Sequence, residues 1–244
     1  MIYYISLPIL VVLYFLGLFL LRFVKNQKIA NICFCASIFV LYITTVIIAY
    51  IKNGLYDWNF LNTLPTANVS PFMFFFCPLV FVLPKSWKPY FKNLIALLSV
   101  GMFLSPVASI VFNGMRNYSF HFSFYLDYIG HLLLSLWGCY FILTKQVELS
   151  IKKSIISGTI IVVVAIIMLL LNVIFKTAFF GLALDDKYNI YNAKIVGNAY
   201  LSALLYFVGL IVIMAIGYLY QKLVLLVDFK IANKREKTET NDGK

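Results

Sequence analysis

Two side chains in one apolar stretch hold the clearest potential for chemistry in this sequence, Asp127 and His131. Residues four apart share a helix face, so a carboxylate and an imidazole would meet there. Beside a general base, such a carboxylate fixes the imidazole tautomer and raises its basicity. The same spacing adds Ser123 and Ser135, which extends the polar stripe to about 18 Å at 1.5 Å per residue.

The elements that must position this stripe are apolar helices. Of the 244 residues, 63% are hydrophobic and 12% charged, whereas soluble domains average about 45–50% and about 25%. Lipid must therefore be the solvent for much of the chain. A charge facing the bilayer centre costs at least about 2.5 kcal/mol, so the stripe is expected to face the bundle interior.

A membrane-crossing helix needs about 20 mostly apolar residues. We predict an all-α fold: a polytopic membrane helix bundle of seven transmembrane helices, residues 1–227, followed by a disordered cytoplasmic tail, residues 228–244. The first run is too long for a signal-peptide core and lacks a basic flank, so it is expected to be retained. The predicted spans are Ile2–Val24, Ile29–Ile51, Asn68–Leu83, Asn93–Phe112, Phe122–Thr144, Ser154–Phe175 and Val196–Val227.

The distribution of Lys and Arg predicts the orientation. Fifteen of these 20 residues follow spans one, three and five or lie at the C-terminal end. Cytoplasmic segments carry such an excess, so the N-terminus is predicted outside and the C-terminus in the cytoplasm, at a cell membrane. The same bias accounts for the net charge of +11, and we expect no nucleic-acid partner.

Further polar residues share the outer half of the predicted bundle with Asp127. A cavity opening outward, or sideways into the outer leaflet, would explain them, and hydrogen bonding between helices is the alternative. The candidates for binding a substrate there are Asn68, Ser105, Ser123, Asn172, Thr177 and Asn198.

The four cysteines lie inside apolar runs, which predicts reduced thiols that serve packing. Two histidines and one buried acid are too few for a zinc site, so neither a metal nor a cofactor is expected.

Several strings resemble the YwaF-like bacterial integral membrane proteins. The string Leu64-Pro65-Thr66-Ala67-Asn68-Val69-Ser70-Pro71-Phe72 is similar to the family's entry into span three, and His131 is similar in placement to a family histidine. Asn172 followed by Lys176-Thr177-Ala178-Phe179 looks like the span-six motif, and Gly197-Asn198-Ala199-Tyr200 looks like the start of the last span. The resemblance covers roughly residues 60 to 220.

Animal relatives of this family look like lipid acyltransferases or lipid hydrolases that use a Cys or Thr nucleophile and a membrane-embedded His. The resemblance implies His131 as the base, oriented by Asp127, and a membrane lipid as the partner. The family's cysteine has no counterpart here, since Ala67, Asn68 and Val69 occupy its region. The nucleophile candidates are therefore Thr66, Thr63 and Ser70.

Two other functions stay open. A transporter or solute-binding membrane subunit could use the same outward cavity, because intramembrane Asp and His also form proton relays. Seven spans without a visible repeat are not the usual inverted-repeat design of transporters. The other possibility is a structural membrane protein without catalysis.

Overall fold

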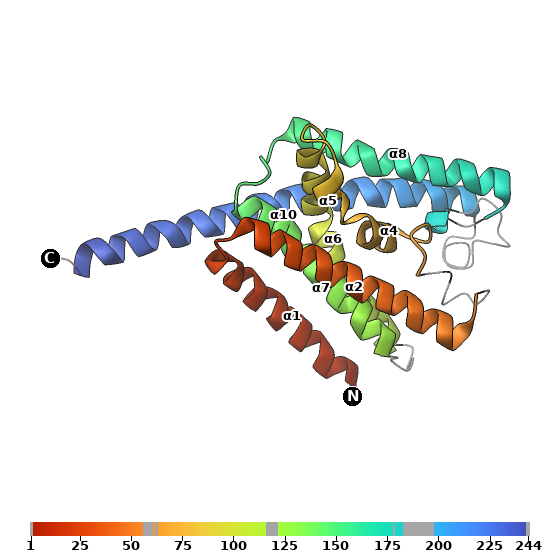
Figure 1. The fold of residues 1–244 in the computed structure, drawn as a ribbon, viewed down its shortest axis with the longest axis horizontal. Coiled ribbons are helices and arrows are strands. Elements are labelled where there is room, and N and C mark those ends of the chain that lie inside the picture. Colours follow the sequence, from red (N-terminus) through yellow and green to blue (C-terminus); the bar gives the residue numbers. More distant parts are fainter. Residues whose placement is uncertain are drawn as a thin grey trace.

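The computed structural model describes residues 2–55, 61, 63–115, 122–177, 179–182 and 198–242. These residues form helices and no strand, so the all-α prediction is confirmed for them (Figure 1). The helices are α1 (Ile2–Leu20), η1 (Leu21–Phe23), α2 (Gln27–Asn53), α4 (Val69–Phe76), α5 (Leu79–Val82), α6 (Lys88–Met115), α7 (Phe122–Leu143), α8 (Ile151–Phe175), η2 (Phe179–Gly181) and α10 (Ala199–Asp242).

Among the described residues, five helices are long and apolar enough to cross a membrane, which makes the chain a multi-pass membrane protein, as predicted. They are α2, α6, α7, α8 and α10. In α1 the apolar helical run is shorter, Leu7–Phe23. These six helices lie where six of the seven spans are predicted.

The predicted third span, Asn68–Leu83, differs from a continuous helix. It forms α4 and α5, which are 8 and 4 residues long. Pro78 lies between them, and proline offers no backbone N–H and clashes with the preceding turn of a helix. The run of apolar residues was recognisable in the sequence, but the proline divides it.

The broken segment lies along α2. The Tyr42 hydroxyl, midway along α2, donates to the Thr63 carbonyl oxygen at 3.0 Å. Cys35 is nearer the start of α2, and its Sγ lies 3.7 Å from Sγ of Cys77. The chain from Thr63 to Cys77 therefore runs antiparallel to α2.

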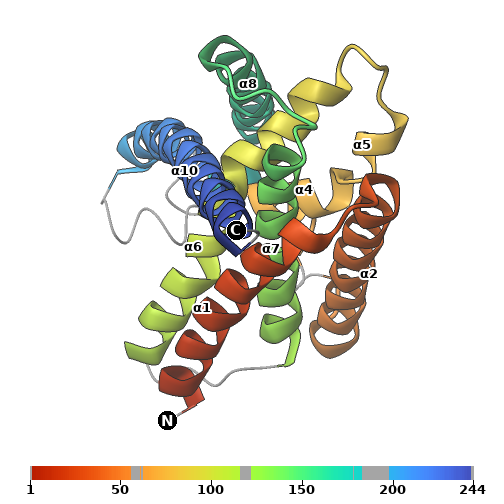
Figure 2. The same ribbon diagram turned by 90° about the vertical axis from the view of Figure 1, so that its left-hand side faces the viewer.

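Helices α6 and α7 form the centre of the bundle, with the other long helices packed around them (Figure 2). In their most apolar 18-residue windows, 61% and 72% of the residues are buried, against 28%, 22% and 22% in α2, α8 and α10. The outer helices consequently present exposed Ile, Leu, Val and Phe side chains to the lipid. Trp137, Tyr140 and Phe141 of α7 are fully buried in the core.

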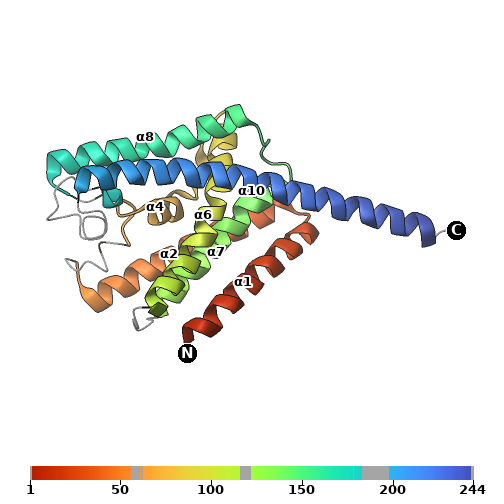
Figure 3. The same ribbon diagram turned by 180° about the vertical axis from the view of Figure 1, so that it is seen from behind.

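Helix α10 has 44 residues and extends well beyond the bundle (Figures 1 and 3). At 1.5 Å per residue it is about 66 Å long, twice the roughly 30 Å of a hydrocarbon core. Its backbone continues as a helix from Asp228 to Asp242, where the sequence predicts a disordered tail. A helix already formed in the bundle can extend without a new nucleation step, and Ala, Lys, Arg and Glu are good helix formers.

Close approach between the helices depends on small residues. A Cβ added to Gly217 of α10 would lie 1.9 Å from the carbonyl oxygen of Leu97 on α6. A Cβ added to Gly138 of α7 would lie 2.8 Å from the carbonyl oxygen of Ile95, also on α6. Such small-residue contacts are the usual means of packing helices in lipid, where no hydrophobic effect drives them together.

The substitution Gly217→Ala should lower stability, because overpacking against a backbone atom costs about 1–3 kcal/mol. Gly209→Ala on the same helix is the matched control, since nothing lies within 4 Å of its added Cβ. In an exposed helix position that change should be neutral or stabilising by up to about 1 kcal/mol. Thermal unfolding of both variants in detergent measures the difference, and equal melting temperatures would contradict the close α6–α10 contact.

Candidate functional site

Helix α7 places Asp127 and His131 one turn apart on one face. The carboxylate oxygen Oδ2 of Asp127 lies 3.4 Å from Nδ1 of His131. The side chain of His131 is 6% exposed and that of Asp127 is 37% exposed. The acid therefore lies at the accessible end of the pair, and the imidazole lies one turn deeper in the core.

The hydrogen bonds of His131 determine which ring nitrogen can act. Nδ1 lies 2.8 Å from the backbone carbonyl oxygen of Asp127. A carbonyl can only accept, so Nδ1 carries the proton in the neutral ring, and Nε2 holds the lone pair. The edge of the Phe74 ring, from α4, packs at right angles to the imidazole with 4.9 Å between ring centroids. These contacts fix the ring and leave Nε2 as its proton acceptor.

The structure does not join the proposed nucleophiles to this base by a hydrogen bond. Within the described residues, neither the Thr66 hydroxyl nor the Ser70 hydroxyl bonds to His131. Ser70 and Thr63 are half-buried, and the Thr63 carbonyl accepts from Tyr42. Ser70 comes one helical turn before Phe74 on α4, so it is the candidate whose neighbour on the helix touches His131.

Asn172 and Thr177 come together at the end of α8. The Asn172 side chain donates to the Phe179 carbonyl oxygen at 2.9 Å and accepts from the Phe179 N–H at 2.7 Å. It also accepts from the Thr177 hydroxyl at 2.9 Å. The next N–H, of Phe180, donates to the Thr66 carbonyl oxygen at 2.8 Å. The buried side chain of Asn172 thus fixes the turn after α8, and the Phe180 N–H joins that turn to the segment that leads into α4.

The remaining substrate-binding candidates that the structure describes are Asn198, Asn68 and Ser105, and none of them is hydrogen-bonded to His131. Asn198 begins α10, where its side chain accepts from the N–H groups of Tyr200 and Leu201 at 2.9 and 3.1 Å. Asn68 precedes α4 and is exposed, and Ser105 is exposed on α6. The side chain of Ser123 lies outside the described residues.

Deeper along α7, Ser135 belongs to a buried polar network that sequence reasoning missed. The Ser135 hydroxyl donates to the Ser99 carbonyl oxygen of α6 at 2.6 Å. Its oxygen lies 3.0 Å from the hydroxyl of Tyr14 on α1, which in turn lies 2.6 Å from the hydroxyl of Tyr220 on α10. Cys139 Sγ lies 3.7 Å from the Tyr14 hydroxyl.

Proton counting gives this network a direction. Ser135 has one proton, and the Ser99 carbonyl can only accept, so that proton goes to Ser99. The Tyr14 hydroxyl must then donate to Ser135, and the Tyr220 hydroxyl must donate to Tyr14. Gln221 completes the network from α10, because its amide donates to the Ala96 carbonyl oxygen at 2.8 Å and the Ser99 hydroxyl at 2.6 Å.

A second polar cluster lies at the end of the bundle opposite to Asp127. Asn31 of α2 accepts from the Trp137 indole at 2.9 Å and donates to Gln146 at 2.7 Å. Lys92 of α6 donates to the same Gln146 oxygen at 2.9 Å. Nearby, the Lys153 ammonium donates to Glu148 and lowers the pKa of that carboxyl, so Glu148 is ionised at neutral pH.

Metal ligands are sparse in the described part of the chain. No group of three or more His, Cys, Asp or Glu side chains gathers there. The described cysteines are free thiols: Cys33 is exposed, and Cys35, Cys77 and Cys139 are buried. The described groups around His131 that can do chemistry are its imidazole and the carboxylate of Asp127.

Comparison with protein families, with curated proteins and with solved structures finds no match to this chain. Its function has to be argued from the geometry of its own residues.

Proposed function

We propose that the chain crosses the membrane seven times, with its N-terminus outside and its C-terminus in the cytoplasm. The broken segment α4–α5 supports the odd number, because it runs antiparallel to α2 and leads from the end of α2 toward the start of α6. Contacts between helix ends support the alternation of the rest. Gln27 at the start of α2 bonds to Thr144 at the end of α7, and Asn93 near the start of α6 bonds to Ser157 near the start of α8.

The sidedness rests on charge. The helix ends that meet around Gln146 are the ones followed or preceded by most Lys and Arg residues of the chain, which is typical of the cytoplasmic face. The membrane in question is then a bacterial plasma membrane, in line with the resemblance to YwaF-like proteins.

The functional centre of this protein is the Asp127–His131 pair, and its task is proton transfer. The observation that carries this proposal is the locked ring of His131, which leaves Nε2 as a single proton acceptor inside the core. Asp127, with more than a third of its side chain exposed, can exchange protons with water on one side of the membrane. Intramembrane acid and histidine pairs of this kind form proton relays in pumps and transporters.

Proton conduction through the bundle, as in a proton-coupled transporter, is the use that the surroundings favour. Neither Thr66 nor Ser70 forms a nucleophile–base hydrogen bond with His131, whereas the polar groups continue inward along α7 at Ser135 and the tyrosines bonded to it. A general base for nucleophilic catalysis must lie within about 2.6–3.2 Å of the hydroxyl that it activates, although apo structures are often looser.

A lipid-active acyltransferase or hydrolase is the second candidate. The observation in its favour is the contact of Phe74 with His131, because Ser70 precedes Phe74 by one helical turn on α4. In that reaction His131 Nε2 would take the Ser70 proton while Ser70 Oγ attacks the ester carbonyl of a membrane lipid. The ester C–O bond would then break, the imidazolium would give the proton to the departing alcohol, and water or a second alcohol would cleave the acyl-serine. The resemblance to lipid acyltransferase-like relatives supports the same substrate class.

The crossing number can be tested by labelling single cysteines from outside intact cells. In a chain without its four native cysteines, Lys52→Cys should react with a membrane-impermeant maleimide, because it ends α2 at the outer face. Lys85→Cys and Glu148→Cys should react only after permeabilisation. Labelling of Lys52→Cys and Lys85→Cys from the same side would mean that α4–α5 does not cross.

Proton transfer can be tested in lipid vesicles that contain a pH-sensitive dye. A potassium diffusion potential should drive proton uptake into vesicles containing the wild-type protein. His131→Ala and Asp127→Asn should reduce the rate to that of protein-free vesicles, since each removes one proton-carrying group. Ile129→Ala, at an exposed site on the same helix, is the control that should keep the rate. Wild-type vesicles no faster than empty ones would reject the relay.

The enzyme alternative predicts a reactive serine. Fluorophosphonate labelling in membranes should attach to Ser70 and disappear in Ser70→Ala. His131→Ala should slow it by about 10²-fold or more, the usual contribution of a general base. Labelling absent from the wild type, or unaffected by His131→Ala, would remove the enzyme from consideration and leave the proton relay.

A further inference from the structure

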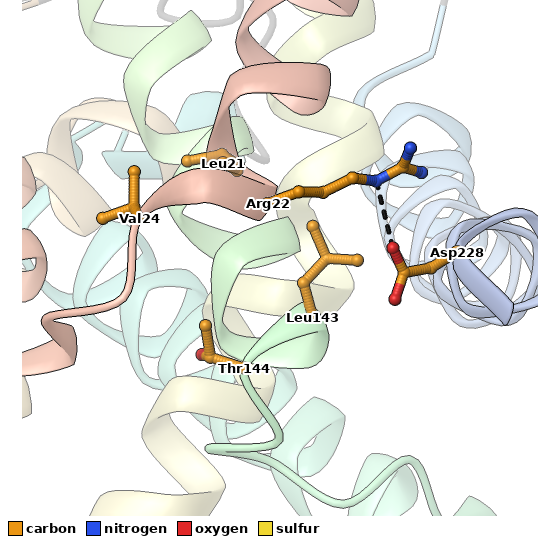
Figure 4. Close-up of a pocket in the computed structure, with 6 residues that line it drawn as sticks. All are labelled: Leu21, Arg22, Val24, Leu143, Thr144 and Asp228. Atoms are coloured by element: carbon orange, nitrogen blue, oxygen red, sulfur yellow. Dashed lines mark ion pairs between the residues drawn. The ribbon is translucent and has the colours of Figure 1, made fainter. Parts of the chain in front are cut away.

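A pocket opens where α1 ends beside α7 and α10 (Figure 4). Its volume is about 120 Å³. The apolar run that begins in α1 ends at Phe23, next to the lining residue Arg22. The apolar run of α10 ends at Ile231, a few residues after the lining residue Asp228. The pocket therefore lies at the level where helices leave the hydrocarbon core and meet lipid headgroups. The residues that line it are Leu21, Arg22, Val24, Leu143, Thr144 and Asp228.

Arg22 brings unused hydrogen-bond donors to this pocket. Its Nε lies 3.0 Å from Oδ1 of Asp228, but the N–H is not aligned for a hydrogen bond. The two terminal nitrogens extend past Nε (Figure 4). A guanidinium has five N–H donors, and within the described chain Asp228 is the one carboxylate at ion-pair distance from it. Most of the donor capacity of this largely buried side chain, 16% exposed, is therefore free for a ligand.

The charge around the pocket favours an anion. Exposed Lys25 and Lys145 directly follow the lining residues Val24 and Thr144. With Arg22 they bring three basic residues to the chain segments that line the pocket, where Asp228 is the one acidic lining residue. Guanidinium donors in a planar fork match the oxygens of a phosphate particularly well.

The flanking surfaces identify where the phosphate comes from. Phe19 and Phe23 next to Arg22 are 48% and 53% exposed, and Leu226 and Val227 next to Asp228 are 59% and 44% exposed. These apolar side chains continue from the pocket along the lipid-facing sides of α1 and α10, where acyl chains would lie. We propose that the pocket binds the headgroup phosphate of an anionic phospholipid, with Arg22 as its ligand and the acyl chains against these two helices.

The site stands independently of the proton relay, because it lies at the other end of the bundle from Asp127. Basic pockets between helices on the cytoplasmic side of membrane proteins are a known means of holding anionic lipids. A bound lipid would link α1 to α10 at the point where α10 leaves the bundle.

The test uses the full-length protein in nanodiscs of phosphatidylglycerol and phosphatidylcholine, followed by mass spectrometry of the lipids that stay bound after extraction into detergent. Arg22→Gln should lower retained phosphatidylglycerol about fivefold, as expected for loss of one basic contact. Lys52→Gln, an exposed cation at the far end of α2, should have no effect. Asp228→Asn should raise retention, because it removes the competing carboxylate.

Three results would overturn the proposal. Equal losses of retained phosphatidylglycerol in Arg22→Gln and Lys52→Gln would indicate general charge attraction rather than a site. A loss of retained lipid in Asp228→Asn would mean that the Arg22–Asp228 ion pair only stabilises the fold. Displacement of the lipid by inorganic phosphate would assign the pocket to free phosphate. If Arg22→Gln does not fold, Arg22→Lys keeps the charge, removes the fork and should still lower retention.

Discussion

Lipid offers no hydrogen-bond partner, so the polar side chains of the central helices have to be satisfied from within the bundle. The structure meets this constraint by bonding across helices. Ser135 of α7 bonds to the backbone of α6, and Gln221 reaches from α10 to the same stretch of α6. These bonds require short distances between helix axes, which Gly217 and Gly138 make possible. Close packing and polar satisfaction in this core thus depend on each other.

The same constraint separates polar groups that hold the structure together from His131, the base of the proposed relay. The side-chain oxygen of Asn172 accepts from a backbone N–H and a hydroxyl, and that of Asn198 caps the first turn of α10. Their hydrogen-bonding capacity is used in holding the chain. His131 differs, because the bond that fixes its ring engages Nδ1, and within the described chain no residue bonds to the basic nitrogen Nε2. Placing an ionisable side chain inside a membrane costs free energy, so a buried histidine of this kind is a candidate for function.

Hydropathy alone predicts most of the fold, since six of the apolar runs are the long helices of the bundle. The break at Pro78 was visible as a proline, but whether a proline kinks or divides a helix depends on neighbours that the sequence does not reveal. The i, i+4 spacing predicted that Asp127 and His131 would meet. The network of Tyr14 and Tyr220 could not be foreseen, because tyrosine in an apolar run is typical of packing or of the membrane interface. Its members are 206 residues apart and meet only through the tertiary fold.

The direction of the buried network bears on how a proton relay would be controlled. A proton leaving His131 toward the other side of the membrane would have to enter the chain at Ser135, the next polar residue along α7. In the observed arrangement the Ser135 proton is held by the Ser99 carbonyl, and the tyrosine hydroxyls donate toward Ser135 rather than away from it. Transfer from Ser135 to Tyr220 therefore requires these hydroxyls to reverse, beginning with release of the bond between α7 and α6. The bond from Ser135 to Ser99 also joins the two central helices. A small separation of α6 from α7 would therefore break this bond and free the Ser135 hydroxyl to turn toward Tyr14. Proton movement would then be coupled to a change in helix packing.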